Sequence, residues 1–151
     1  MSETKDLPAP PDDPESPYGL IFQSYVEGKV NLGLKYLTLN QRKSPVFSRW
    51  ENIIPYAFIV IIVANYTYEY GYVGFCASLL LSALVGFYFI PKWLAKRVRT
   101  RALTMALTSE EGWDTLWAAG GLGLRLTRNP EIGCDSPDDD WRAFVTKYLK
   151  N

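Results

Sequence analysis

The residue types that covalent catalysis needs are scarce in this sequence. It contains no histidine, which removes the commonest general base, the commonest metal ligand and every serine–histidine or cysteine–histidine nucleophile. Its two cysteines, Cys76 and Cys134, lie far apart and form no CxxC motif, so neither a zinc site nor a thioredoxin-like motif is indicated. The sequence therefore predicts a protein that is not an enzyme.

One acidic cluster, made of Asp135, Asp138, Asp139 and Asp140, could suggest a metal site. It lacks the spaced glutamate and the glycine of an EF-hand, so calcium is not favoured. Charge at a helix start is the better interpretation, because acidic side chains stabilise the positive N-terminal end of a helix. We predict no metal and no cofactor, and an enzyme that uses a tyrosine, an aspartate or Cys134 is the minor alternative.

Two apolar stretches dominate the middle of the chain. Residues 71–90 read GYVGFCASLLLSALVGFYFI and carry no charge. A helix of that length reaches about 30 Å, the thickness of a bilayer's hydrocarbon core. The sequence therefore predicts a transmembrane helix over about residues 72–91. A shorter apolar run predicts a first span over residues 52–68, with a buried helix of a soluble protein as its alternative.

The second predicted span carries small residues at every fourth position. Residues four apart lie on one side of a helix, and small side chains there let another helix approach closely, which is the main source of helix association in lipid. The partner is left open between the chain's other membrane helix, a second copy and another protein. The predicted helix-packing interface consists of Gly74, Ser78, Ser82 and Gly86.

Basic residues gather on the outer flanks of the two spans, and the segment between the spans has none. Because cytoplasmic flanks carry an excess of lysine and arginine, both termini are predicted to be cytoplasmic, in a membrane of the bacterial inner-membrane type. The same cations could also hold anionic lipid headgroups. The residues assigned to lipid headgroups or topology are Arg42, Lys43, Arg49, Lys92, Lys96, Arg97, Arg99 and Arg101.

The segment between the spans, residues 66–72, is rich in tyrosine and is predicted to be a loop outside the membrane. Tyrosine suits the headgroup level, because its ring is apolar and its hydroxyl prefers water. An aromatic belt is the favoured interpretation, and a tyrosine-lined contact with a quinone or a sterol is the alternative. The tyrosines are Tyr66, Tyr68, Tyr70 and Tyr72.

The N-terminal part divides into a tail and an approach to the membrane. Residues 1–19 are rich in proline and acidic residues, which predicts a disordered tail. Residues 20–49 mix helical and alternating apolar periods; we favour an amphipathic juxtamembrane helix, with a piece of a small core, or a strand from Val30 to Tyr36, as alternatives.

Residues 95–151 are predicted to form a small cytoplasmic helical subdomain. Thr108 is the expected N-cap of a helix that carries two tryptophans, and Ser136 is the expected N-cap of the last helix. The apolar side of the last helix is expected to pack on the tryptophan helix, or else on another protein or on lipid. The predicted docking face consists of Trp113, Trp117, Trp141, Phe144 and Tyr148.

These predictions combine into one fold class and one leading function. The fold is mainly α: a two-helix transmembrane hairpin over residues 50–94, with a cytoplasmic helical appendage and a disordered tail. Sixteen basic and sixteen acidic residues cancel, which gives no reason to expect nucleic-acid binding. We expect a non-catalytic accessory, assembly or scaffolding subunit whose partners are membrane lipid and other membrane subunits or itself. A self-associating effector that perturbs the bilayer and a curvature-making hairpin are the alternatives.

Overall fold

The computed structural model describes residues 10–11 and 13–150, and most of them are helical. They divide into two compact units. The first, which we name the folded domain, consists of the described residues up to Phe47 and those from Arg99 onward; the second, the long-helix unit, covers Ser48–Val98. Most of the predicted tail lies outside the described residues, but its last part, from Pro17, is helical.

The folded domain contains a three-stranded antiparallel sheet, whereas the sequence predicted a helical subdomain for residues 95–151, with a short extended piece possible only where Leu122, Leu124 and Leu126 alternate. Strand β1 (Val30–Leu34) pairs with β2 (Leu122–Leu126), which pairs with β3 (Gly133–Asp135). Alternating side chains of β1 and β2 point into the core, so Val30 and Leu124 are almost completely buried. The predicted amphipathic helix is therefore wrong for β1, and segments predicted as separate parts share one sheet.

Four helices complete the folded domain together with the end of α4. Ser16 accepts a hydrogen bond from the Gly19 N–H (2.9 Å), and Pro17 occupies the first helical position, so helix α1 begins well before residue 20. The Arg142 guanidinium of α6 connects this last helix to α5 by donating hydrogen bonds to Glu110 (2.9 Å) and Asp114 (2.8 Å). The helices are α1 (Pro17–Val26), α2 (Tyr36–Leu39), α5 (Glu110–Ala118) and α6 (Trp141–Tyr148).

Both predicted N-caps are replaced by other residues. Ser109, not Thr108, caps α5 by accepting from the Gly112 N–H (3.0 Å), because Thr108 is still the last residue of α4. Asp140 caps α6, and Ser136 instead hydrogen-bonds the backbone of Leu122 in β2. In both places several polar side chains could serve as the cap, and the neighbouring elements decide which one does.

The core of the folded domain is built around Trp113, which is completely buried. Its ring stacks on Trp117 (centroids 6.1 Å apart) and meets Trp141 edge to face (5.9 Å) and Tyr18 likewise (6.4 Å). The Tyr18 hydroxyl donates to the Ala106 carbonyl (3.1 Å), and burial raises the pKa of Tyr18 to about 12. Helices α1, α5 and α6 therefore meet at one aromatic cluster, and the Tyr18 hydroxyl connects this cluster to the end of α4.

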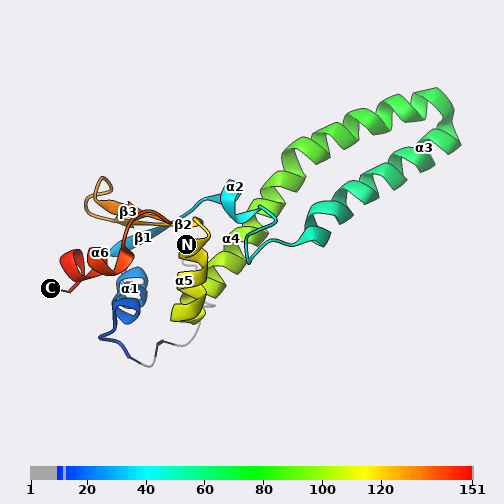
Figure 1. Cartoon of the computed structure of the whole chain (residues 1–151). Coiled ribbons are helices and arrows are strands. Elements are labelled where there is room, and N and C mark those ends of the chain that lie inside the picture. The colour runs from blue at the N-terminus through cyan, green and yellow to red at the C-terminus, as the bar shows by residue number, and fades with distance from the viewer. Residues whose placement is uncertain (1–9, 12, 151) are drawn as a thin grey trace. The chain divides into compact units, whose positions relative to one another are not determined.

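The long-helix unit is formed by one continuous helical element, of which the residues from Arg99 to Thr108 belong to the folded domain. Helix α3 (Arg49–Leu84) passes through a π-helical turn, η2 (Val85–Phe89), into α4 (Ile90–Thr108). Only Gly71 departs from helical geometry inside α3, with φ 61° and ψ −143°, a conformation open to glycine but not to side chains with a Cβ. The chain turns back at this residue, so the two halves of α3 lie beside each other (Figure 1). We name residues 49–70 the first arm, and residues 72–98, which continue from α3 through η2 into α4, the second arm.

The predicted non-helical loop at residues 66–72 is wrong. Helical hydrogen bonding continues through the tyrosines, and the structure has one long apolar helix folded at Gly71 in place of two helices joined by a loop. Tyrosine has an intermediate helix propensity and does not by itself end a helix. The reversal of the chain needs a backbone conformation with positive φ at one residue only, and Gly71 provides it. The turn is therefore shorter than the sequence predicted.

Candidate functional site

The apolar side chains of the long-helix unit are largely exposed. Nearly all the exposed large apolar residues of the described chain lie between Trp50 and Trp93. The helical element Arg49–Thr108 has an 18-residue window of mean hydropathy 2.2, of which only 17% is buried. By length and composition it is the one helix in the described part of the chain that could cross a membrane. A contiguous apolar surface of this extent marks an interface with lipid or with protein.

Aromatic side chains lie at both ends of this apolar surface. At the turn, Tyr68 is 87% exposed and Tyr72 is 81% exposed; at the start of α3, Trp50 is 70% exposed. Tyr66 follows Trp50 by sixteen positions, which corresponds to about 24 Å along a helix. That spacing is comparable with the hydrocarbon thickness of a bilayer, and tyrosine and tryptophan favour its two boundaries.

The predicted basic residues are dispersed over several elements. Two of them stack on aromatic rings of the second arm: Lys92 Nζ lies 3.7 Å from the Tyr88 ring centroid, and Arg97 Cζ lies 5.3 Å from that of Trp93. Such contacts keep a cation close to the end of the apolar surface. The others lie after α2 (Arg42 and Lys43), at the first position of α3 (Arg49) and along α4 (Lys96, Arg99 and Arg101).

The small-residue row faces the chain's own first arm. Gly74 and Ser78 are buried and Ser82 is half-buried. At Gly86 a Cβ in place of the hydrogen would meet the Ile59 side chain at 3.6 Å, an ordinary packing distance. Of the partners that the sequence left open, the structure shows the chain's other arm. The row is therefore not an open surface for another helix.

The tryptophan-rich face is also occupied. Trp113, Trp117, Trp141 and Phe144 are buried in the folded domain, and only Tyr148, 37% exposed, reaches its surface. Trp141 Nε1 donates to Asp114 (3.1 Å) and Trp117 Nε1 donates to the Asp139 carbonyl (3.0 Å). The last helix thus packs on the tryptophan helix, as the sequence favoured, and these residues form a core and not an open docking face.

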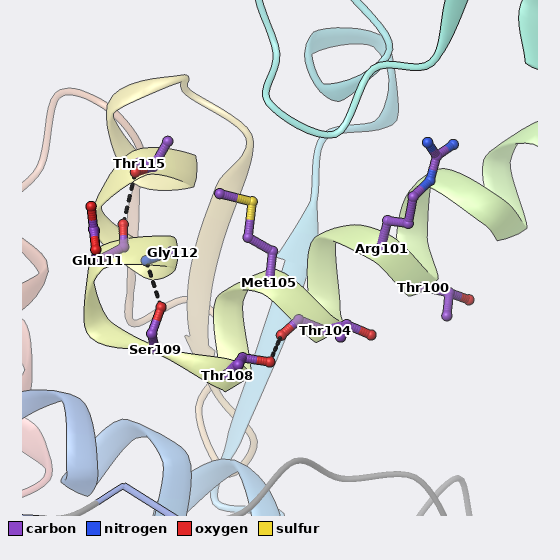
Figure 2. Close-up of a pocket in the computed structure, with 9 residues that line it drawn as sticks. All are labelled: Thr100, Arg101, Thr104, Met105, Thr108, Ser109, Glu111, Gly112 and Thr115. Atoms are coloured by element: carbon purple, nitrogen blue, oxygen red, sulfur yellow. Dashed lines mark hydrogen bonds between the residues drawn. The ribbon is translucent and has the colours of Figure 1, made fainter. Parts of the chain in front are cut away.

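A hydroxyl-lined groove of about 510 Å³ lies between α4 and α5. Figure 2 shows Thr100 and Arg101 at one end, Thr108 and Ser109 at the other, and Met105 projecting between the helices. The helices approach closely because α5 has glycine at position 112, where any Cβ would lie 2.3 Å from the Met105 carbonyl. The groove was missed at the level of sequence, although threonines recur at every fourth residue of α4.

The groove does not assemble a catalytic arrangement. Thr108 donates to the Thr104 carbonyl (2.6 Å), and Thr115 donates to the Glu111 carbonyl (2.8 Å), so both hydroxyls are bound to their own helices. Ser109 is held by its capping bond, and the chain has no histidine to activate it. A nucleophile needs a base within hydrogen-bond reach, so the contacts at these hydroxyls favour binding over bond-making chemistry.

Asp135 of the predicted acidic cluster pairs with basic side chains of the folded domain. Arg125 of β2 donates to its carboxylate, and Lys35 Nζ lies 3.8 Å from it. The hydrogen bond from Arg125, followed by the charges of Arg125 and Lys35, lowers the pKa of Asp135 from its usual value of 3.8. The Arg125–Asp135 pair joins β2 to β3, and Lys35 connects it to the residue before α2, which is a structural role.

Replacing Asp135 with asparagine should flatten the acid limb of the stability profile. Because its pKa is depressed in the folded chain, ionised Asp135 stabilises the fold above the unfolded pKa, and this contribution is lost as pH falls through the folded pKa. The pair is half exposed, so the loss at neutral pH should stay below about 1 kcal/mol. Denaturant titrations of both proteins from neutral pH down to about pH 3 measure it.

The matched control for this substitution is Asp138→Asn, which removes the same charge from an exposed position of the same segment. It should leave the acid limb unchanged. A wild-type profile no steeper than that of Asp135→Asn would contradict the assigned role of the Arg125–Asp135 pair.

Cys134 should be unreactive in the folded protein. Its side chain is 5% exposed, and burial, with a smaller effect of the Asp139 charge, raises the pKa of its thiol to about 12. The thiolate is the reactive species, so at about pH 8 almost none is present. In a Cys76→Ala background, maleimide should label Cys134 orders of magnitude more slowly in the native protein than in urea. Equal rates in the two conditions would contradict this burial.

Comparisons of the chain with protein-family models, with curated proteins and with solved structures found no match.

Proposed function

We propose that this chain is an integral membrane protein whose long helix crosses the bilayer as two antiparallel arms joined at Gly71. The observation that supports this proposal is the exposed apolar surface between Trp50 and Trp93. Contact of this surface with water is unfavourable, and the hydrocarbon of a bilayer would cover it. Close approach of the arms at Gly74, where a Cβ would lie 2.3 Å from the Tyr66 carbonyl oxygen, fits association within lipid, because small residues permit such an approach.

The proposed topology places both termini in the cytoplasm of a bacterial-type cell. Lysine and arginine occur before position 50 and after position 91, and none occurs between them. The positive-inside rule then assigns the turn at Gly71 to the outer side and the folded domain to the cytoplasmic side. Trp50 and Trp93 would lie at the inner headgroup level, and the tyrosines at the outer one.

The proposed role is that of a non-catalytic accessory, assembly or scaffolding subunit. The buried thiol of Cys134 and the self-bonded hydroxyls of the α4–α5 groove offer no activated nucleophile. Because the small-residue row and the tryptophan cluster are covered by the chain itself, partner contacts would fall on other surfaces. The available ones are the outward sides of the two arms and the exterior of the folded domain.

Membrane extraction and thiol labelling test the insertion and the topology. In a Cys76→Ala and Cys134→Ala background, Tyr68→Cys and Lys150→Cys each introduce one exposed thiol. With intact cells, a membrane-impermeant maleimide should label Tyr68→Cys only, and both variants should label after the cells are opened. Release of the protein by alkaline carbonate, or labelling of Lys150→Cys in intact cells, would contradict the proposal.

Purification in mild detergent tests the accessory role. The full-length chain is expected to co-purify with a membrane protein at constant ratio, and cross-linking in intact cells should trap the same pair. Recovery of this chain alone, without a partner and without self-association, would overturn the accessory role and leave the membrane insertion standing.

A further inference from the structure

An apolar crevice lies between the first and second arms of the long-helix unit, at the end remote from the Gly71 turn. It is lined by Pro55 of the first arm and by Phe89, Ile90 and Trp93 of the second, and its volume is about 410 Å³. All four residues belong to the long-helix unit. Phe89 and Trp93 remain 56% and 42% exposed, so the crevice is open at its side.

The backbone of the second arm explains why a crevice occurs here. Pro91 has no N–H and cannot bond the carbonyl four residues before it, which would weaken a regular α-helix. The chain instead widens into η2, where the Ile90 N–H donates to the Val85 carbonyl, five residues back. This wider turn comes directly before Pro91 and sets the positions of Phe89 and Ile90. On the opposite wall, Pro55 presents a rigid ring that cannot rearrange to fill the space.

Positive charge is concentrated next to this crevice. The Arg97 guanidinium stacks 5.3 Å from the ring of Trp93, a wall of the crevice, and follows it by one helical turn. Four basic residues of the long-helix unit lie within six positions of a lining residue: Arg49, Lys92, Lys96 and Arg97. Over the same positions there is one acidic residue, Glu51. An apolar slot bordered by a net positive charge matches an amphiphile with an acyl chain and an anionic head.

We propose that the crevice binds one anionic phospholipid, with an acyl chain between Pro55 and Trp93 and the phosphate beside Arg97. The inference rests on the proposed membrane insertion of the long helix. Trp93 has two functions in this site, because its ring contacts the acyl chain on one side and holds the Arg97 guanidinium on the other. Lipid bound in this way fills the space between the arms and contributes to their association.

Native mass spectrometry of the full-length protein in detergent tests this site. The probes are phosphatidylglycerol and phosphatidylcholine with identical acyl chains, and glycerol phosphate as a soluble headgroup without a chain. The wild-type protein should retain one phosphatidylglycerol in preference to phosphatidylcholine. Glycerol phosphate should not displace it, because the acyl chain supplies much of the binding.

Two pairs of variants separate the charged and apolar parts of the site. Arg97→Gln should reduce the preference for phosphatidylglycerol by about fivefold, whereas Arg99→Gln should leave it unchanged, because residues two apart point to nearly opposite sides of α4. Trp93→Ala should reduce retention of both lipids, whereas Trp50→Ala, outside the crevice, should not. Circular dichroism confirms that each variant keeps its helix content.

Equal retention of the two lipids by the wild-type protein would overturn the proposed site, as would an identical effect of Arg97→Gln and Arg99→Gln. Displacement by glycerol phosphate would reassign the cations to a soluble phosphate compound and overturn the lipid site. Alkaline carbonate extraction of the membranes from which each protein is purified distinguishes this failure from that of the proposed function. A protein that stays in the membrane but shows no lipid preference overturns the crevice site alone.

Discussion

Replacing Gly71 with valine is expected to open the folded-back long helix. Gly71 has φ 61° and ψ −143°, a region in which a β-branched side chain collides with the backbone, at a cost of about 1–3 kcal/mol. Gly71 is the only residue of α3 outside helical geometry, so backbone strain at this position should weaken the pairing of the two arms. Contacts such as that between Ile59 and Gly86 should then form in a smaller fraction of molecules.

Cross-linking measures this effect in the membrane-embedded protein. Ile59→Cys and Gly86→Cys, introduced with Cys76→Ala and Cys134→Ala, place two thiols at the contact between the arms. A short thiol-specific cross-linker should join them efficiently, and Gly71→Val should lower the yield by roughly tenfold, the factor that about 1.4 kcal/mol produces.

The matched control for Gly71→Val is Ala77→Val, which adds a branched side chain at a helical position of the same element. It should leave the cross-linking yield unchanged. If Gly71→Val cross-links as well as the parent, the turn does not depend on the conformational freedom of glycine, and the role assigned to this residue is wrong.

Replacing Trp113 with alanine is expected to destabilise the folded domain by about 3–5 kcal/mol, the usual range for removing a large buried aromatic side chain. Trp113 is fully buried and contacts Tyr18, Trp117 and Trp141, so its loss leaves a cavity where three helices meet. Denaturant titration of the full-length protein in detergent, followed by near-ultraviolet circular dichroism, measures the change.

Two further variants make this prediction specific. Trp50→Ala removes a tryptophan that is 70% exposed and should leave the denaturation midpoint of the folded domain unchanged. Trp113→Phe should cost clearly less than alanine, because the buried Trp113 Nε1 has no hydrogen-bond partner among the described residues and its removal breaks no such bond. Equal denaturation midpoints for the wild-type protein and Trp113→Ala would contradict the placement of Trp113 at the centre of the core.

Much of the local structure follows from short-range patterns. The alternation of Leu122, Leu124 and Leu126 indicates an extended segment, and these residues form β2. The spacing of Trp141, Phe144 and Val145 predicts a one-sided helix, and α6 buries these side chains. Such patterns can be recognised in the sequence because the spacing of apolar residues within one helix or strand determines which of its side chains are buried.

The positions of helix caps and turns were harder to predict from the sequence. Ser136 has the residue type and the following proline of an N-cap, yet its hydroxyl bonds Leu122, fourteen residues earlier. A hydroxyl has few hydrogen bonds to make, so one tertiary partner is enough to displace a local one. At the start of α5 the competing bond is local: Thr108 is the last residue of α4 and donates to the Thr104 carbonyl, so Ser109 serves as the cap.

The occupants of the adhesive surfaces were decided only by the tertiary structure. The row from Gly74 to Gly86 indicated a helix partner without saying which, and the structure places Ile59 of the same chain against it. The tryptophan face was consistent with a core or with a docking site, and Trp113, Trp117 and Trp141 are buried together. A periodic face predicts burial, but the element that covers it depends on contacts between distant segments.

The sequence by itself determined that this chain carries two apolar helical stretches, with cations on their outer flanks, in a protein without histidine chemistry. Those properties depend on composition along a continuous segment, so no distant contact is needed to establish them. Only the tertiary structure decided that β1 pairs with β2 across nearly ninety residues of chain and that Gly71 alone reverses the helix. Strand pairing and chain reversal depend on which remote groups complete each other's hydrogen bonds and buried surfaces, and a local pattern contains no record of that choice.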